Sequence, residues 1–306
     1  MPHMRSSSKL NIIATADLHI RANRPQFRTD DYFTTVIRKF RQIISTANRY
    51  DAILIVAGDF FDSVKVGHKV VNSVLQSLKR LKNKCYVCSG QHDMVFHSSD
   101  LTGSPLQTLI HTGKVVLLKN DKPEIVGKHR LYGCSFGEEP KNTEKDSILV
   151  IHKSITPEEP PFFLTDAISA RDALKKYSSY KLIISGDFHE PFIKRINNRT
   201  LINCGPMLRQ SIDQTELEPV IWLIKEGKIR KIKLKIEPPE KVFALEQIKK
   251  KEDSRFSKEL EELVDTLKDK KEKPDYKNTV ELIMKESNTS KQTKDKVYEI
   301  FGAIDD

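Results

Sequence analysis

The segment NIIATADLH, residues 11–19, combines an apolar run that favours a β-strand with two potential metal ligands directly after it. Asp17 and His19 are two positions apart, so an extended backbone presents both side chains on the same face. Four later segments also place polar ligands after an apolar strand. They are AILIVAGDFFD at 52–62, KCYVCSGQHD at 84–93, SILVIH at 147–152 and KLIISGDFH at 181–189.

Amphipathic stretches separate these apolar runs. Residues 32–48 and 70–81 place apolar side chains at helical spacing, and residues 164–177 do so more weakly. Strands that alternate with helices predict an α/β fold with a mixed or parallel sheet. Because such sheets gather ligands beyond the carboxyl ends of their strands, we expect the five polar segments to meet at one edge.

The chain is expected to have three parts. Residues 1–9 are interpreted as a disordered start or tag remnant, 10–237 as the main domain, and 240–306 as a charged helical C-terminal region. A hairpin over 220–236 closes the main domain, and its second arm alternates basic and apolar residues as a half-exposed edge strand does. Pro238 and Pro239 mark the break before the C-terminal region.

The charge is uneven along the chain. The formal net charge is +10, with 52 basic and 42 acidic residues. Residues 240–306 carry 15 basic and 17 acidic side chains, so residues 1–239 carry 37 and 25. A basic main domain indicates a polyanionic partner such as nucleic acid, although a solubilising surface has the same charge.

The composition favours a cytoplasmic protein. The sequence contains four cysteines, most of them in apolar strands, where they act as small buried hydrophobic residues. No stretch approaches the roughly 20 apolar residues that a membrane span needs, and the start lacks a hydrophobic signal core. We therefore expect no membrane contact and a cytoplasmic, nucleoid-associated location, or the host cytoplasm for a viral protein.

The polar segments have the ligand types of a two-metal centre. Two cations roughly 3.5–4 Å apart can clamp a phosphoryl oxygen and stabilise a leaving oxygen, which requires a carboxylate between them. Carboxylate and amide oxygens combined with imidazole suit Mn²⁺, Fe or Zn²⁺, and Mn²⁺ best tolerates an octahedral mixed set. Strand ends often carry Asp and Gly, but this does not explain why four of the nine histidines lie there.

The order of these motifs resembles the calcineurin-like metallophosphoesterases. That family has Asp-x-His, Gly-Asp, Gly-Asn-His-Asp, His and Gly-His-x-His in this order. Within it, GDFFD at 58–62 and CGPMLRQS at 204–211 are similar to signatures of the SbcD-type nucleases, which process DNA double-strand breaks. The resemblance covers roughly residues 10–236. It implies a layered sandwich of β-sheets flanked by helices, with a short helical C-terminal extension.

The resemblance also implies the metal ligands. The first ion would be held by Asp17, His19, Asp59 and His189, and the second by Asp59, Gln91, His152 and Asp187. Gln91 stands where the family has Asn, and Asp187 stands where it has His. Gln is longer than Asn and Asp is shorter than His, so the two changes can compensate in reach. We expect the second site to be re-tuned towards a hard ion such as Mn²⁺ rather than lost.

Other residues have roles that follow from the same resemblance. His92 would donate a proton to the leaving oxygen, and Asp93 would orient its imidazole and raise its pKa. Arg21 and Arg24, in the loop after the first motif, and His97 are candidate contacts to substrate phosphates.

Other basic residues lie near these in the sequence or form a cluster of their own. Arg28 in the same loop and the cluster at 79–84 are additional candidates for phosphate contacts. Asp62 is interpreted either as support for the site or as a direct participant.

The predicted function is a two-metal-dependent DNA exonuclease and endonuclease in break processing, repair or recombination. The resemblance implies a homodimer and an SMC-like coiled-coil ATPase partner of the SbcC type, bound through the C-terminal helical segment. Two alternatives remain open at this point. One is a small-molecule or cyclic-nucleotide phosphodiesterase of the same fold, and the other is a DNA-binding scaffold with weakened catalysis.

Overall fold

The structure is a computed structural model that describes residues 10–95, 98, 100–141, 143–161, 164, 166–211 and 214–247. The chain divides into two compact units, Met1–Phe243 and Ala244–Asp306. The first unit extends past the break expected at Pro238 and Pro239, because it includes the short helix α5 (Pro239–Val242). Residues 1–9 and the helices predicted beyond residue 247 lie outside the described residues.

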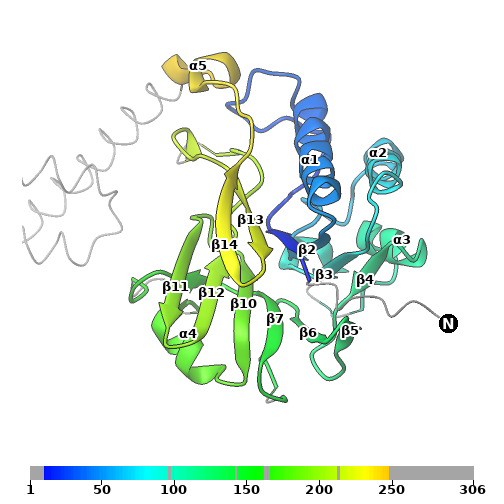
Figure 1. Cartoon of the computed structure of the whole chain (residues 1–306). Coiled ribbons are helices and arrows are strands. Elements are labelled where there is room, and N and C mark those ends of the chain that lie inside the picture. The colour runs from blue at the N-terminus through cyan, green and yellow to red at the C-terminus, as the bar shows by residue number, and fades with distance from the viewer. Residues whose placement is uncertain are drawn as a thin grey trace, which may run out of the picture. The chain divides into compact units, whose positions relative to one another are not determined.

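The first sheet has the order β14-β13-β1-β2-β3-β4 (Figure 1). The strands β1, β2, β3 and β4 run parallel, and the hairpin β13–β14 joins antiparallel at the edge beside β1. This hairpin confirms the predicted closing element and its edge strand. The bounds are β1 (Ile12–Thr15), β2 (Ile53–Ala57), β3 (Cys85–Cys88), β4 (Val115–Leu117), β13 (Val220–Lys225) and β14 (Lys228–Lys233).

The second sheet has the order β11-β12-β10-β7-β6-β5. Its four central strands are parallel, and both edge strands are antiparallel to their neighbours. The bounds are β5 (Glu124–Val126), β6 (His129–Cys134), β7 (Ser147–His152), β10 (Tyr180–Gly186), β11 (Phe192–Ile196) and β12 (Arg199–Asn203). A small parallel pair, β8 (Ile155–Thr156) and β9 (Ile168–Ser169), lies between β7 and β10 in the sequence.

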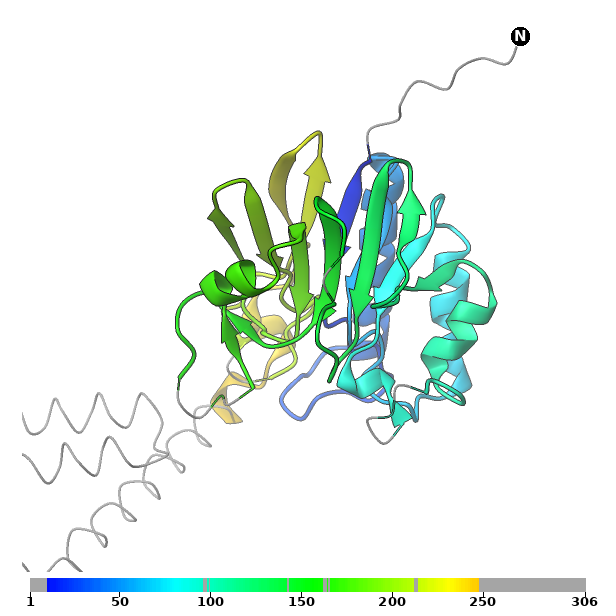
Figure 2. The ribbon, with the colours of Figure 1, turned by 90° about the horizontal axis from the view of Figure 1, so that it is seen from below.

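Helices cover the outer faces of both sheets, as Figure 2 shows from below. The helices α1 (Tyr32–Arg49), α2 (His68–Leu78) and α3 (Pro105–His111) pack on the first sheet, and α4 (Ala170–Lys176) packs on the second. The layers of the first unit therefore run helix, sheet, sheet, helix. This arrangement confirms the predicted sandwich, in which α4 is shorter than the stretch expected at 164–177.

The central strands are buried on both faces, which explains their continuous apolar runs. In β1, Ile12 packs between the two sheets, whereas Ile13 packs under the helices. Cys85 and Cys88 separate in the same way, and all four cysteines are free and buried. Among the described residues, no helix combines the length and apolar character needed to cross a membrane.

Candidate metal centre

Four predicted ligands adopt a backbone conformation that non-glycine residues rarely take. Asp17, His19, Asp59 and Asp187 have φ values of 49°, 42°, 48° and 86°. They make up half of the eight non-glycine residues with positive φ in the described part of the chain. Such conformations are costly and persist where the surrounding structure enforces them, often at functional sites. Here these conformations turn the backbone sharply in the loops that follow β1, β2 and β10.

The glycines that precede the ligands are required by close packing. A Cβ atom on Gly58 would lie 2.0 Å from the His152 ring, and one on Gly90 would lie 2.1 Å from the Asp59 carboxylate. At Gly186 a Cβ atom would lie 2.2 Å from a main-chain oxygen of β2. The strand-end glycines therefore allow the two sheets to bring their ligands together, as the sequence pattern indicated.

Asp59 lies at the centre of the site. Its Oδ2 atom is 3.4 Å from His152 Nε2, 3.7 Å from His19 Nε2 and 4.0 Å from His92 Nε2. Its Oδ1 atom accepts a hydrogen bond from the main-chain N–H of His92 at 2.9 Å. One carboxylate thus faces imidazoles from three separate segments, which is the position that a bridging ligand must occupy.

Three of the residues predicted to hold the first metal lie close together. Asp17, His19 and His189 each offer one ligand atom, and these atoms lie within 4.8 Å of one another. The Asp17 carboxylate accepts the main-chain N–H of Asp187 at 3.2 Å, which joins the ends of β1 and β10. The side chain of Gln214 lies 3.0 Å from His189 Nδ1 and holds this half-exposed ring in place.

The residues predicted to hold the second metal lie beside Asp59. His152 Nδ1 donates to the Ala57 carbonyl at 2.8 Å, because a carbonyl can only accept. The Nε2 atom of His152 is therefore available and also lies 3.7 Å from Asp187 Oδ1. The two residues that depart from the family pattern contact each other, since Gln91 Nε2 donates to Asp187 Oδ1 at 3.0 Å.

The polar atoms of the site fit divalent cations. His19 Nε2, Gln91 Oε1 and His152 Nε2 are buried and have no hydrogen-bond partner among the described residues. An unpaired buried polar atom costs roughly 1–3 kcal/mol, so three of them in one place indicate a missing partner. Imidazole nitrogens, an amide oxygen and carboxylates are suitable ligands for Mn²⁺, Fe or Zn²⁺.

The protonation of the site reflects burial and crowding. Burial raises the pKa of Asp17 to about 8 and lowers the pKa of His19 to about 3. Burial also opposes the charged forms of Asp59 and His152, but their mutual attraction outweighs it. The pKa of Asp59 is therefore lowered, and the pKa of His152 is raised to about 10.

His92 lies at the open side of the centre. Its Nδ1 atom donates to the Asp62 carbonyl at 2.8 Å, and 44% of its side chain is exposed. Its ring meets the His19 ring edge-on with centroids 4.8 Å apart. This position leaves Nε2 facing the site, where a proton can pass to a bound molecule.

The Asp93 side chain makes different contacts from those expected. Its carboxylate accepts the main-chain N–H groups of Gly90, Phe60 and Phe61 at 3.0–3.1 Å. It is buried, and burial raises its pKa to about 6. Asp93 thus ties the β2 and β3 loops together, whereas the His92 ring is oriented by the main chain of Asp62.

The candidate substrate contacts have different surroundings in the structure. Arg21 Nη1 donates to Asp62 Oδ2 at 2.8 Å, and Asp62 Oδ1 lies 3.7 Å from His19 Nδ1, so Arg21 borders the centre. Arg24 is exposed and donates to the Thr29 carbonyl at 3.3 Å within its own loop. His97 lies outside the described residues.

Two other basic groups do not lie at the site. Arg28 is buried, pairs with Asp30 at 2.8 Å and, with Arg209, encloses the ring of Phe243. Its role is therefore structural. The cluster at 79–84 precedes β3, so it lies at the amino end of that strand, opposite the metal ligands.

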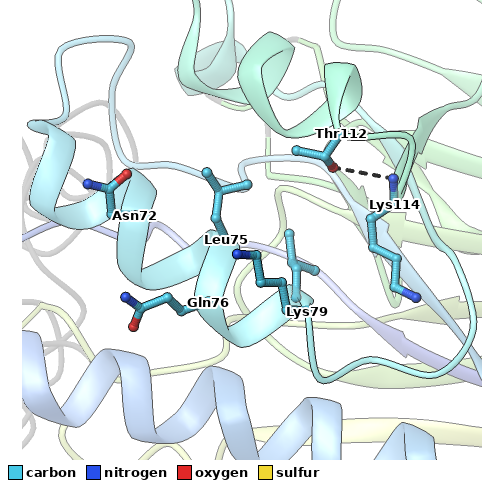
Figure 3. Close-up of a pocket in the computed structure, with 7 residues that line it drawn as sticks. Asn72, Leu75, Gln76, Lys79, Thr112 and Lys114 are labelled. Atoms are coloured by element: carbon cyan, nitrogen blue, oxygen red, sulfur yellow. Dashed lines mark hydrogen bonds between the residues drawn. The ribbon is translucent and has the colours of Figure 1, made fainter.

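A pocket beside α2 also lies apart from the centre. It has a volume of about 570 Å³ and includes Lys79 of this cluster (Figure 3). None of the predicted metal ligands belongs to its lining, which consists of Asn72, Leu75, Gln76, Leu78, Lys79, Thr112 and Lys114.

Several groups that hold the site residues in position were not predicted from the sequence. The carbonyls of Ala57 and Asp62 orient His152 and His92, and main-chain groups have no residue-type signal. Asn203 at the end of β12 is fully buried and donates to the carbonyl of Glu190 at 2.8 Å, in the loop that carries His189. A buried polar residue at the end of an apolar strand is a signal that could have identified it.

A comparison with models of known protein families identifies the family of this chain. The model of the calcineurin-like phosphoesterases matches residues 10–191. A comparison with curated proteins gives no match. One solved structure, of a novel archaeal phosphodiesterase, is 15% identical and covers 74% of this chain and 100% of its own, with a TM-score of 0.43. Since the family model spans more than half of the sequence and its ligand motifs meet in space, the chain belongs to the calcineurin-like phosphoesterase family.

Proposed function

We propose that this protein is a two-metal-dependent phosphodiesterase that cleaves DNA, as an exonuclease and endonuclease in break processing. The observation that carries the proposal is the arrangement around Asp59. Ligands from both sheets surround this carboxylate, and the half-exposed His92 lies at the open side.

Different residues of the chain would bind the metals and donate the proton. Two divalent ions, for which the ligand set favours Mn²⁺, would be held by Asp17, His19, Asp59, His189, Gln91, His152 and Asp187, and when bound they supply Lewis acidity and an activated water. His92 would act as the general acid. As a water oxygen forms a new bond to phosphorus and the phosphorus–oxygen bond to the leaving group breaks, Nε2 would transfer a proton to the leaving oxygen. The Asp62 carbonyl keeps the ring in position during this transfer.

The choice of DNA rests on charge and on the SbcD-type resemblance. The excess of basic residues lies in the part of the chain that carries the site, with 37 basic and 25 acidic residues in 1–239. Arg21 borders the centre, and Arg24 is exposed in the same loop. Contacts from arginine to phosphate carry no base information, so cleavage should be largely independent of sequence and weaken steeply with salt.

The same resemblance supports two partners. We propose a homodimer, and an SMC-like coiled-coil ATPase of the SbcC type that binds the C-terminal region 240–306. The apolar stripes on charged helices expected there suit binding along a coiled coil. A cytoplasmic, nucleoid-associated location follows from such a role.

A nuclease assay tests the proposal directly. Linear and circular DNA are incubated with Mn²⁺, Mg²⁺ or a chelator, and products from the circular form report endonuclease activity. We expect cleavage with Mn²⁺ and none with the chelator.

The His92→Ala variant is the matched control. It should lower the rate by roughly 10²–10⁴-fold while metal binding is retained. An unchanged rate in this variant refutes the role of His92. Hydrolysis of bis-p-nitrophenyl phosphate without DNA cleavage supports a small-molecule phosphodiesterase instead, and DNA binding without hydrolysis supports a scaffold.

A further inference from the structure

Two buried arginines enclose an aromatic ring at the end of the first unit. The guanidinium carbons of Arg28 and Arg209 lie 5.2 and 5.5 Å from the ring centroid of Phe243, the last residue of this unit. All three residues have exposed fractions of only 3%. A guanidinium over an aromatic face is attracted to it, most strongly where water is excluded. The Phe243 ring is therefore held in place, and with it the point from which the C-terminal region starts.

Main-chain contacts join the same point to the loop between β1 and α1. Phe243 forms an antiparallel bridge with Arg28, and the N–H of Thr29 donates to the Val242 carbonyl at 2.9 Å (Figure 1). Arg28 also makes two hydrogen bonds to the Asp30 carboxylate, at 2.8 and 2.9 Å. The loop that follows the first ligand motif is thus bound directly to the start of the C-terminal region.

Arg209 holds three segments of the chain together. Its guanidinium donates to the carbonyl of Thr215 at 2.7 Å and to that of Glu237, and its own carbonyl accepts a bond from Arg28 Nη1 at 2.9 Å. A lysine in its place keeps the charge but lacks the planar fork that reaches two carbonyls at once.

The segment just before Arg209 lies against a predicted metal ligand. The N–H of Met207 donates to the Asp17 carbonyl at 3.4 Å, and Pro206 pairs with Ala16 in a parallel bridge. Asp17 has a φ of 49°, a conformation that persists only with support from its surroundings. Contacts to its main chain therefore help to fix the position of its carboxylate.

We infer that Arg209 is a positioning residue of the first metal site, and that Phe243 couples this site to the start of the C-terminal region. The inference rests on the metal binding of the proposed function but not on DNA as the substrate. A ligand that draws the chain beyond Phe243 into another conformation would loosen the contacts of Arg209, and the first site would bind its ion less tightly. Because coupling between two sites is reciprocal, binding of the ion should in turn stabilise the contacts around Phe243.

Hydrogen exchange of the full chain tests the coupling without any substitution. Peptides over 24–32 and 236–244 contain the hydrogen-bonded amides of Thr29 and Phe243. We expect saturating Mn²⁺ to slow exchange in both peptides by roughly 2- to 30-fold. The control is a peptide over 106–116, around the end of α3, where exchange should change little. Slowing of all three peptides to the same extent indicates a general stabilisation by bound metal and contradicts the inference.

Two substitutions measure the size of the effect. Phe243→Leu keeps an apolar side chain but loses the aromatic face, and Arg209→Lys loses the planar fork. Calorimetric Mn²⁺ titration in a Gln91→Leu background, which removes a predicted ligand of the second ion alone, should show first-site affinity lowered by roughly 2- to 30-fold in each. The matched control is Phe33→Leu, which should leave the affinity unchanged. Lys69 Nζ lies 4.9 Å from the ring centroid of Phe33, so this cation–π contact joins α1 to α2.

A merely structural role predicts a different result from coupling. It would lower the Tm of the metal-free variants without changing their affinity for Mn²⁺. Should a variant not fold, the exchange comparison on the wild type still decides.

Failure of the inference differs from failure of the proposed function. If Mn²⁺ binds the wild type but leaves exchange around Phe243 unchanged, or if Phe243→Leu binds Mn²⁺ as tightly as the Phe33→Leu control, the coupling is refuted and the metal centre stands. If the wild type neither binds Mn²⁺ nor hydrolyses a phosphodiester, the proposed function fails, and the inference fails with it.

Discussion

The two sheets each position a buried histidine at the site, and the pKa values of these two histidines are shifted in opposite directions. His19, after β1 of the first sheet, has a pKa that burial lowers to about 3. His152, at the end of β7 of the second sheet, has a pKa of about 10, because the attraction of carboxylates outweighs burial. Both rings are almost inaccessible, with exposed fractions of 6% and 1%, so burial does not explain the difference.

The difference comes from their neighbours. His19 has the rings of His92 and His189 as neighbours, with centroids at 4.8 and 5.8 Å. His152 lies 3.4 Å from Asp59 and 3.7 Å from Asp187, whereas His19 lies 3.7 Å from both Asp59 and Asp62. The predicted ligands of each side include two carboxylates, but the first side has two imidazoles, whereas the second has one imidazole and the amide of Gln91. The expectation that Asp187 in place of the family's His suits the second site to a harder cation stays a prediction.

The largest effect should come from Asp59, the ligand common to both sides. Asn at this position can still accept the N–H of His92 but cannot supply an anionic bridge. We expect Asp59→Asn to lose both ions and about 10³-fold or more in rate, because the bridge positions both ions. Metal analysis and rate assays check this, with unchanged circular dichroism as the control for folding. Two ions per chain and near-normal activity in this variant would show that Asp59 is not needed as a bridge between the ions.

A pair of substitutions tests the second side alone. Since Gln91 donates to Asp187, we expect the residues to act as a unit. Gln91→Asn and Asp187→His should each weaken Mn²⁺ binding at one site by roughly 10–100-fold. The double variant restores the family pattern and should regain most of the loss. Calorimetric Mn²⁺ titration measures both sites. Losses that simply add in the double variant contradict the coupling.

The pH dependence of thermal stability distinguishes the effect of bound protons from the effect of bound cations at the site. Without metal, Asp17 and His152 have pKa values raised to about 8 and about 10. A raised folded-state pKa gives stability that is present below the unfolded pKa and is lost as pH rises through the folded value. The Tm of chelator-treated protein should therefore fall from pH 6 to 8.5, by about 5 °C.

Bound Mn²⁺ should abolish most of this fall, because the cations replace the protons. The stabilisation by Mn²⁺ consequently grows with pH. Scanning calorimetry with and without Mn²⁺ measures it, and a stabilisation that is constant across this pH range argues against ligand deprotonation.

The smallest effect should come from Asp62, which supports the first side. Asp62→Asn keeps the carbonyl that orients His92 but weakens the contacts to Arg21 and His19. We expect a loss of up to about 10-fold in first-site metal affinity, with little change in the His92-dependent step. Metal titration and the pH profile of kcat distinguish these effects. A shifted pH profile with normal metal affinity would reverse this assignment.

Much of the fold could be predicted from local patterns. Helical spacing identified α1 and α2, and apolar runs identified the central strands of both sheets. The pattern of α4 was too weak to define its start. The division of the strands between two sheets depends on which faces pack together, and local periodicity does not report this.

Most of the site could also be anticipated, because the chemistry of a ligand belongs to its residue type. Asp17, His19, Asp59 and His152 converge where the strand-end rule places them. The roles expected for Asp93 and Arg28 were wrong, because both groups are buried and bind the main chain or a neighbouring carboxylate. Sequence position alone does not distinguish a charged group at the site from one that supports a loop.

The sequence by itself determined the α/β class, the family and the residue types of the candidate metal centre, since these depend on local patterns and on side-chain chemistry. Only the tertiary structure decided which atoms meet. The contact between Gln91 and Asp187, separated by 96 positions, and the carbonyl that orients His152 depend on how two sheets pack and where their strands end. Local sequence specifies what each residue can offer, whereas the packing of distant strands selects its partner.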